Sequence, residues 1–454
     1  MDSENLLLLT DSYKLSHWQQ YPMYTKGCYH YFESRTGAKF PSTCFFGLQY
    51  LLKKYLTGQV VTQEKIDEAQ KISDFHINKN VFNKYSWKNI LTYSNGYLPI
   101  SIKAVPEGTC VNTSNVLFTV ESTCRYAYWL PGYIGSLLTQ CWYPSTVATI
   151  SKEMKNIISH YLPLIDTSSR MHDFGFRGST SVESAALGGA AHLINFIGTD
   201  NIPAINLIRK YYYDDMAGCS IAAAEHDSIL SWGREGEFNA IRNLLLTFSR
   251  EPLSIVADTY NLDGFFEHLK KLWDFIKLRT HNLVIRPDSG LLPHSLIYVL
   301  ETLGRIFGYT YDIMGFKLLA HPFKVLQGDG ISLDNLKSIL QAVYSHGWSI
   351  ENLYFGCGSG LLQSCNRDTQ RFAYKLSNWQ GENDTERDVY KCPATDMSKS
   401  SKAGKLKLVK EGKNYRTVKQ SEPGEDCLVE VFRDGKILKE YTLGQIRSNA
   451  NMEC

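Results

Sequence analysis

The chain has 454 residues, more than the roughly 250–300 residues that a single hydrophobic core usually serves, so at least two structural units are expected. Hydrophobic residues make up 43% and charged residues 21%, a composition that excludes a disordered or fibrous chain. The 48 Lys and Arg against 46 Asp and Glu give a net charge of +2, so no overall field attracts nucleic acid or an acidic membrane, and any anion site must be local.

The first part of the chain, residues 1–146, has the pattern of an α+β unit. Short apolar runs at 29–34 (YHYFES) and 100–108 (ISIKAVPEG) indicate strands, and the spacing of apolar residues around 62–72 indicates a helix. We therefore expect this segment to form part of a domain that is separate from the next one.

From residue 147 to 375 one pattern recurs: a short apolar run ends in polar or Gly residues, and a helical segment follows. The runs lie at 171–178, 194–200, 219–226, 253–258, 283–290, 323–330 and 353–360. Seven such repeats predict an irregular seven-stranded β/α barrel, in which all the polar strand ends converge on one ligand site. A doubly wound sheet, which uses only the ends at its switch point, is the alternative.

The last part, residues 376–454, turns polar and Lys-rich between 399 and 413 and then alternates again in CLVEVFRDGKILKEY. This pattern predicts a loop followed by a β-hairpin, with Asp434-Gly435 as its turn. We expect the segment to pack with the N-terminal part in one β-rich α+β domain.

The eleven cysteines have neither CxxC nor metal-ligand spacing, which is typical of reduced thiols in the cytoplasm. The beginning of the chain carries acidic residues, and no apolar run approaches the ~20 residues of a membrane span. We therefore expect a cytoplasmic protein with no export signal, no membrane helix and no nucleic-acid partner.

Two strand ends carry an acidic residue beside Gly. In RPDSG, Arg286 and Asp288 would lie together, where a guanidinium can stabilise phosphate charge and a carboxylate can hold ribose hydroxyls or a divalent cation. Gly328 and Asp329 repeat the arrangement in QGDG. A structural Arg–Asp pair or an ordinary tight turn explains either motif taken alone.

A third strand end is rich in glycine. Gly358 and Ser359 lie in FGCGSG, a strand-to-helix turn whose backbone N–H groups suit a phosphate, although it matches neither a Walker A nor a dinucleotide fingerprint. Arg367, seven residues further on, could close over the same anion or could be a solvated helix residue.

The other strand ends supply further polar side chains: His172, Asp173, Arg177, Asp200, Glu225, His226 and Asp258. Phe174 lies among them, where an aromatic ring could stack on a flat heterocycle. A ligand site at the strand ends that is rich in Arg, Asp and Gly suggests a phosphorylated sugar ligand. A metal-dependent hydrolase that uses His172, Asp173, His226 and Asp258 as ligands is an alternative, although no HxH or HExxH spacing supports it.

Taken in order, TDSYK, QYLLKKYL, KAVPEG, CWYP, HDFGFRG, FIGTD, AAEH, RPDSG, QGDG, FGCGSGLLQ and QIRSNA resemble the motifs of nicotinamide phosphoribosyltransferases over nearly the whole chain. This family belongs to the type II phosphoribosyltransferase, or nicotinate phosphoribosyltransferase, superfamily. The resemblance implies transfer of phosphoribose from phosphoribosyl pyrophosphate to nicotinamide in NAD salvage. It also implies Mg2+, ATP as a co-substrate, and a homodimer with active sites at its interface.

The resemblance also implies roles for individual residues. Phe174 of one subunit and Tyr13 of the other would sandwich the pyridine ring, Asp200 would accept a hydrogen bond from the carboxamide, and Ser254 and Arg286 would line the same tunnel. Asp288 and Asp329 would bind ribose, and Asp258 and Asp288 would hold Mg2+ and pyrophosphate. Phosphates would contact Arg177, Gly358, Ser359, Arg367 and the partner's Arg35, Lys391 and Lys399, and Gly328 would bind substrate beside Asp329. His226 would be phosphorylated by ATP.

Ser359 replaces a glycine of the family's FGSGGG motif, so a side chain stands where the phosphate normally meets backbone. A nicotinate phosphoribosyltransferase is the nearest alternative, but it would need a cation near the ring substituent, and Asp200 carries the opposite charge. A non-catalytic binding protein would not need Arg286, Asp288 and Asp329 together.

Overall fold

The computed structural model describes residues 4–383, 385–395 and 399–452. The chain divides into two compact units. The first comprises residues 1–149, 210–214 and 365–454, and the second comprises residues 150–209 and 215–364. The unit boundaries thus lie at 149 and 364, and the short segment 210–214 belongs to the first unit.

The first unit is built on an antiparallel seven-stranded sheet. Its strands, in spatial order, are β16 (Glu386–Asp388), β15 (Ala373–Gln380), β1 (Gly27–Glu33), β5 (Val116–Ser122), β3 (Ile100–Ala104), β19 (Val429–Arg433) and β20 (Lys436–Ile437). Two strand pairs complete the unit: β2 (Ser42–Cys44) with β4 (Cys110–Asn112), and β17 (Leu406–Glu411) with β18 (Asn414–Lys419).

The predicted hairpin is confirmed. β19 and β20 pair through Phe432 with Ile437 and Arg433 with Lys436, and Asp434 and Gly435 both have positive φ, as a two-residue hairpin turn of the primed type requires. β19 also pairs with β3, so the C-terminal segment joins the sheet of the N-terminal strands.

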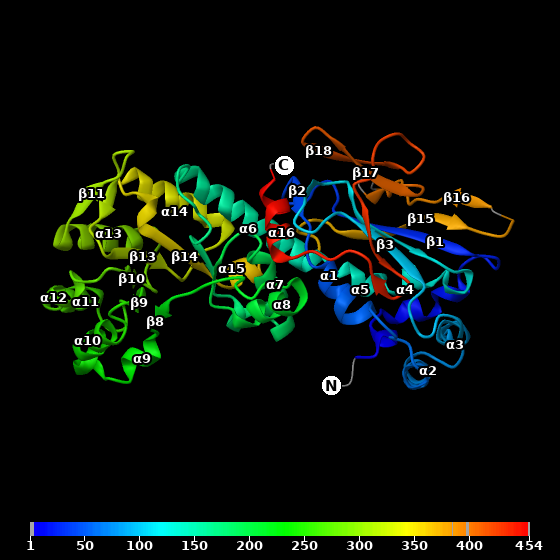
Figure 1. Cartoon of the computed structure of the whole chain (residues 1–454), viewed down its shortest axis with the longest axis horizontal. Helices are drawn as coiled ribbons and strands as arrows, with labels where there is room; N and C mark the ends of the chain where they lie inside the picture. Colours follow the sequence, from blue (N-terminus) through cyan, green and yellow to red (C-terminus); the bar gives the residue numbers. More distant parts are fainter. Residues whose placement is uncertain (1–3, 384, 396–398, 453–454) are drawn as a thin grey trace. The chain divides into compact units, whose positions relative to one another are not determined.

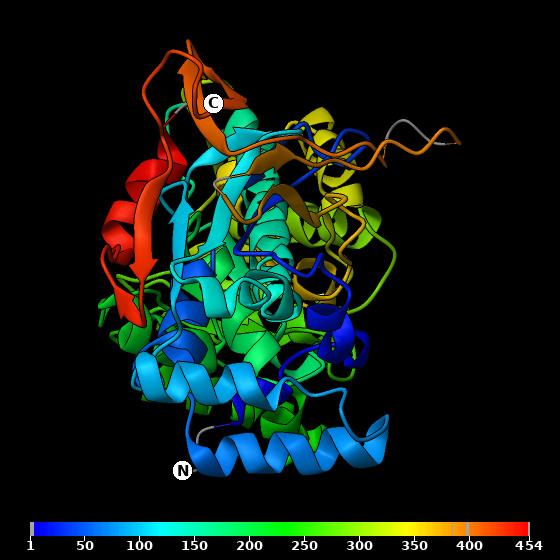
Figure 2. The ribbon, with the colours of Figure 1, turned by 90° about the vertical axis from the view of Figure 1, so that its right-hand side faces the viewer.

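Short helices accompany this sheet: α1 (Leu48–Leu51), α2 (Gln63–His76), α3 (Lys84–Tyr93), α4 (Leu130–Tyr133), α5 (Gly135–Thr139) and α16 (Leu443–Asn451). The predicted helix near 62–72 is α2, which begins where the Thr62 side chain accepts a hydrogen bond from the Lys65 N–H at 3.4 Å. α2 and α3 lie side by side (Figure 2).

The second unit contains a parallel seven-stranded sheet, and its strands are the seven predicted ones. In spatial order they are β7 (Gly198–Thr199), β6 (Met171–Asp173), β14 (Leu353–Cys357), β13 (Phe323–Gln327), β10 (Leu283–Arg286), β9 (Leu253–Val256) and β8 (Ala222–Ala223). β9 is buried throughout, as a strand covered on both faces should be.

The sheet curls, with the connecting helices around it (Figure 1), but it is not the closed barrel that we expected. Its edge strands β7 and β8 have two residues each and do not pair; only an isolated bridge links Gly198 to Cys219 at that edge. Strands this short cannot form a continuous hydrogen-bonded ladder, and the sheet therefore remains a curled, partly open structure.

The helices that follow these strands are α7 (Val182–His192), α9 (His226–Leu230), α10 (Glu237–Thr247), α11 (Leu262–Lys271), α12 (Trp273–Ile276), α13 (His294–Phe307), α14 (Leu333–Ser345) and α15 (Ser359–Leu362). The helices α6 (Trp142–Tyr161) and α8 (Ile202–Tyr212) run across the boundaries between the units. A hairpin of β11 (Tyr309–Tyr311) and β12 (Lys317–Leu319) extends from α13. No helix among the described residues is both long and apolar enough to cross a membrane.

Candidate active site

The ring of Phe174 lies against glycines at the carboxyl ends of two other strands. A Cβ atom built on Gly356 would lie 2.2 Å from Cε2 of Phe174, and one built on Gly328 would lie 3.3 Å from it. The Phe174 N–H donates to the Cys357 carbonyl at 3.0 Å, which continues the pairing of β6 with β14. The two glycines are therefore needed to make room for an aromatic ring at the predicted site.

Four polar side chains meet beside this ring. Nε2 of His226 lies 3.8 Å from Oδ1 of Asp258 and 3.7 Å from Oδ2 of Asp288, and Nε of Arg286 lies 3.6 Å from Oδ1 of Asp288. Burial raises the pKa of Asp288; Arg286 and His226 oppose the increase, and Asp258 and Asp329 add to it. The residues come from the ends of β8, β9 and β10, as the alternation of strands and helices predicted.

Several buried polar atoms around this cluster have no hydrogen-bond partner in the described part of the chain. They are Oγ of Ser254, Oδ1 of Asp258, Nε of Arg286 and Oε1 of Gln327. Leaving a buried donor or acceptor unpaired costs about 1–3 kcal/mol each, and native proteins do so where a ligand completes the bonding. Because these atoms lie on neighbouring strands and three of them lie at strand ends, the carboxyl edge of the sheet is the candidate ligand site.

Asp200 and Arg177 lie at the same edge of the sheet and are exposed. Oδ1 of Asp200 accepts a hydrogen bond from Oγ of Ser220 at 2.5 Å. Nη1 of Arg177, in the short helix Phe176–Gly178, lies 2.9 Å from Oε1 of Glu225. An exposed pair of this kind contributes little to stability, so Arg177 can exchange its partner for a phosphate at small cost.

The predicted phosphate turn lies between β14 and α15. Gly358 precedes α15, and a Cβ built on Gly178 would lie 2.5 Å from Oγ of Ser359. The Ser359 side chain therefore fits beside Gly178 because the glycine has no side chain of its own. Asp329 is exposed after β13, and its carbonyl accepts a hydrogen bond from Nε2 of Gln327 at 2.8 Å.

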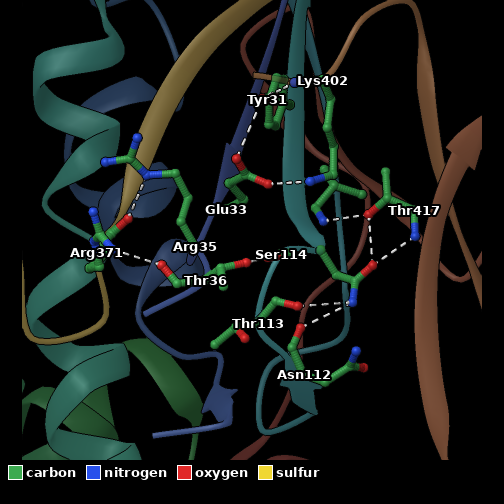
Figure 3. Close-up of polar contacts among 12 residues, drawn as sticks. Tyr31, Glu33, Arg35, Thr36, Asn112, Thr113, Ser114, Arg371, Lys402 and Thr417 are labelled. Atoms are coloured by element: carbon green, nitrogen blue, oxygen red, sulfur yellow. Dashed lines mark hydrogen bonds and ion pairs between the residues drawn. The ribbon is translucent and has the colours of Figure 1, made fainter. Parts of the chain in front are cut away.

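The first unit carries a cluster of cations on β1, β15 and the segments that flank them. Nε of Arg35 donates to the Arg371 carbonyl at 3.1 Å, and Nζ of Lys402 lies 2.5 Å from Oε2 of Glu33 (Figure 3). Burial lowers the pKa of Lys375, and Arg35, Lys391 and Arg367 lower it further. Backbone carbonyls and one acid thus hold several positive charges close together.

The remaining predicted residues also lie in the first unit. Tyr13, in the 3-10 helix Ser12–Gln19, is 59% exposed, and its hydroxyl lies 3.4 Å from Oδ2 of Asp11. Lys391 and Lys399 lie between β16 and β17, where Oγ of Ser401 accepts a hydrogen bond from the Lys391 N–H at 2.8 Å. Tyr13 and these lysines thus belong to the first unit, whereas Phe174 belongs to the second.

Gln327 and Lys375 are among the residues of these clusters that were not predicted. Gln327 precedes the QGDG glycines and could have been included as the last residue of the apolar run. Lys375 faces the cluster because β15 pairs with β1 and places Lys375 opposite Tyr31, and that register cannot be read from the local sequence. Only the alternation of YKLSNW, which indicates a strand, points to it.

A metal-dependent hydrolase is not supported. Among residues 4–383, 385–395 and 399–452 no group of three or more His, Cys, Asp and Glu side chains could hold a metal ion. Asp173, one of the ligands that this alternative requires, already accepts hydrogen bonds from the Gly175 N–H and from Nδ2 of Asn201.

Comparisons with known proteins agree with this site. Residues 169–436 match the sequence model of the nicotinate phosphoribosyltransferase (NAPRTase) family, and residues 5–102 match that of the nicotinamide phosphoribosyltransferase N-terminal domain. The chain is 42% identical to a nicotinamide phosphoribosyltransferase of Xanthomonas campestris, over 99% of this chain and 98% of the relative. It is 31% identical to one of Acinetobacter baylyi, over 98% and 96%.

The fold also has solved counterparts. A nicotinate-nucleotide pyrophosphorylase from Pyrococcus furiosus matches with a TM-score of 0.64 at 13% identity, covering 100% of this chain and 98% of that one. Human nicotinic acid phosphoribosyltransferase matches with 0.60 at 14%, covering 98% and 93%. These structures show a shared fold, and the sequence matches show more: the chain belongs to the nicotinate phosphoribosyltransferase family, within which its full-length relatives are nicotinamide phosphoribosyltransferases.

Proposed function

We propose that this enzyme transfers the phosphoribosyl group of phosphoribosyl pyrophosphate to the ring nitrogen of nicotinamide, giving nicotinamide mononucleotide and pyrophosphate in NAD salvage. The full-length relatives carry the name of this activity. The observation that supports the proposal at the site is the set of buried atoms without a hydrogen bond on neighbouring strands and their ends, on Ser254, Asp258 and Arg286. The substrates would supply the missing hydrogen bonds.

The chemistry requires alignment and charge stabilisation more than a strong base, because the pyridine nitrogen is already a nucleophile. Phe174 presents a ring face for stacking, and Asp200 presents an acceptor for the carboxamide N–H. Its negative charge disfavours the carboxylate of nicotinate. As the bond from C1′ to pyrophosphate breaks, positive charge develops on the ribose, and Asp288 would stabilise that charge.

Phosphate contacts would come from both units. Arg177 and the turn at Gly358 and Ser359 would bind substrate phosphates within the second unit, and Arg367 would do so from the first. Asp329, after Gly328, would hold the ribose hydroxyls.

The two carboxylates suit Mg2+. This ion is usually bound through one or two carboxylates together with substrate phosphates, and Asp258 offers a buried oxygen without a partner next to Asp288. Asp258 and Asp288 would hold the ion, which would neutralise charge on the leaving pyrophosphate. The Asp288 N–H, which donates to Oδ2 of Asp258 at 3.2 Å, keeps the two strand ends together.

We further propose that the enzyme is a cytoplasmic homodimer in which one copy's first unit completes the other copy's active site. Tyr13 would stack on the nicotinamide ring, and Arg35, Lys391 and Lys399 would bind phosphates. The cation cluster around Lys375 supports this role, since the mutual repulsion of its members would be relieved by a phosphate.

His226 would be phosphorylated by ATP and so couple ATP hydrolysis to nucleotide formation. Its ring is half-buried between Asp258 and Asp288, next to the site proposed for pyrophosphate. No ATP consumption above background during turnover would contradict this coupling.

The first test is product formation with phosphoribosyl pyrophosphate, Mg2+ and either nicotinamide or nicotinate, each with and without ATP. We expect nicotinamide mononucleotide to form preferentially, and ATP to stimulate its formation. Preferential product from nicotinate would instead assign the chain to the nicotinate enzymes, and no product from either base would overturn the proposed reaction.

The shared active site can be tested by mixing two impaired variants, assayed with phosphoribosyl pyrophosphate below the wild-type KM. Asp288→Ala disables the second unit and Lys375→Ala weakens the first, so a mixed dimer would contain one site with both parts intact. After subunit exchange, about a quarter of the wild-type activity should return. A mixture no more active than its components would contradict the sharing of sites between subunits.

A further inference from the structure

Asp173 is a buried carboxylate between the two residues proposed to contact nicotinamide. It is the last residue of β6 and has no exposed surface. Its Oδ1 accepts a hydrogen bond from the Gly175 N–H at 2.7 Å, and its Oδ2 accepts one from Nδ2 of Asn201 at 2.8 Å. Gly175 directly follows Phe174, and Asn201 directly follows Asp200.

The backbone strengthens the same connection. The Asp200 N–H donates to the carbonyl of Asp173 at 3.0 Å. One carboxylate oxygen of Asp173 thus contacts Gly175, which follows Phe174. The Asp173 carbonyl contacts the N–H of Asp200, and the other carboxylate oxygen contacts the side chain of the residue that follows Asp200. A single residue links the aromatic and the acidic sides of the pocket.

The surroundings leave the carboxylate no other position. A Cβ on Gly189 of α7 would lie 2.6 Å from Oδ2 of Asp173 and 2.5 Å from Nδ2 of Asn201. Nδ2 of Asn201 also donates to the Ala185 carbonyl at 2.9 Å. The small residues of α7 thus allow the helix to approach and close the network from behind.

A charged group at this place is costly to the fold. Burial raises the pKa of Asp173 to about 6, the two hydrogen bonds oppose that increase, and the neighbouring Asp200 carboxylate adds to it. A neutral side chain would avoid the loss of hydration. Asp173 lowers stability, yet its hydrogen bonds hold the chain at Asp200 and next to Phe174. This combination indicates a role in the pocket.

We infer that Asp173 is a positioning residue, which fixes the Phe174 ring and the Asp200 carboxylate relative to each other so that both can contact nicotinamide. This inference rests on the proposed function. Displacement by about 1 Å can cost as much as a hundredfold in rate, so loosening this link should weaken recognition of the base while leaving the phosphate contacts intact.

The test compares Asp173→Asn with wild type and with Asn352→Ala. Asn352 is an equally buried side chain of the same unit, near the amino end of β14, with bonds to the Leu319 N–H and the Lys317 carbonyl. Asp173→Asn should raise KM for nicotinamide about tenfold and reduce the preference over nicotinate, with KM for phosphoribosyl pyrophosphate within about twofold of wild type. Asn352→Ala should lower Tm without changing the ratio of the two KM values.

An unchanged nicotinamide KM in Asp173→Asn, or both KM values rising together, would overturn the inference. Should that variant not fold, Asn201→Ala removes one donor to the same carboxylate and should shift nicotinamide KM in the same direction by a smaller factor; no shift there would equally overturn it. Wild-type turnover is measured first, so failure of the proposed function appears as an inactive wild type and is distinct from failure of the Asp173 role.

Discussion

Two clusters of polar groups, one in each unit, differ in how the described residues satisfy them. At the strand ends of the second unit, Asp258 and Arg286 each keep a buried atom that has ionic neighbours but no hydrogen-bond partner among the described residues. In the first unit, Arg35 is bonded to a backbone carbonyl and Lys402 to Glu33. Buried atoms without a hydrogen bond favour a ligand whose own groups have a defined geometry. A cation that is bonded to a neutral carbonyl keeps its full charge and can still attract an anion such as phosphate. Precise alignment should therefore depend on the second unit, and phosphate affinity on the first.

The largest effect should follow from Asp288→Ala. In the proposed reaction this carboxylate stabilises the charge that develops on the ribose, and its loss also leaves Arg286 and His226 without their shared neighbour. We expect kcat to fall by about a thousandfold, measured as initial rates of nicotinamide mononucleotide formation.

Asp274→Asn is the matched control, because Asp274 is an 85% exposed carboxylate of the same unit that pairs only with Lys277. It should leave kcat unchanged. A fall in kcat of less than tenfold in Asp288→Ala would contradict the distinction between groups that align the substrates and groups that only attract them.

A second prediction concerns stability, because Asp173 is retained at a cost. Its pKa is raised from 3.8 to about 6 in the folded state, so the folded chain binds more protons than the unfolded chain between these values. This contribution to stability is complete below the unfolded pKa and is lost as pH rises through the folded pKa. Between pH 4 and pH 8 the free energy of unfolding of Asp173→Asn should therefore gain about 2.5 kcal/mol relative to wild type.

Urea unfolding of wild type and Asp173→Asn at several pH values measures this difference in the free energy of unfolding. The titration of all other groups contributes equally to both proteins and cancels in the difference. A flat difference for Asp173→Asn would show that its carboxylate is not destabilised by burial, and the argument for a functional reason to keep it would fail.

Much of the second unit could be predicted because its information is local. Each apolar run ends in its own polar residues, so RPDSG and QGDG already indicate which side chains meet at the edge of the sheet. The closure of the sheet could not be predicted, because β7 and β8 are too short to show whether they pair.

The cation cluster of the first unit depends on distant pairing. Lys375 is one lysine among many until the register of β15 against β1 sets it opposite Tyr31. In the same way, the bonds of Asp173 to Gly175 and Asn201 depend on how β6 and the segment after β7 meet. Sequence patterns identified Asp173 only as a polar strand end.

The third prediction tests the first unit. Lys375→Met removes one charge and keeps the length of the side chain, so KM for phosphoribosyl pyrophosphate should rise about tenfold with a small change in kcat. The effect should weaken as salt concentration increases, because screening reduces the contribution of the charge.

Lys419→Met is the control, since Lys419 is an exposed lysine of the same unit whose partner is Asp388. It should not change either KM. A fall in kcat equal to that of Asp288→Ala would show that Lys375 aligns the reacting groups, and the contrast between the two units would break down.

The smallest effect should come from Asp200→Ser, which tests charge rather than alignment. Asp200 is exposed to solvent, where a unit charge within about 4 Å is worth about 1 kcal/mol, so the preference for nicotinamide over nicotinate should fall about fivefold in kcat/KM. Competition between the two bases in one reaction measures that ratio directly. Ser220→Ala leaves the charge but removes the hydrogen bond to Oδ1 of Asp200, and it should alter the ratio less. Selectivity that is unchanged in Asp200→Ser would exclude repulsion by this carboxylate, and discrimination would then rest on the geometry that Asp173 maintains.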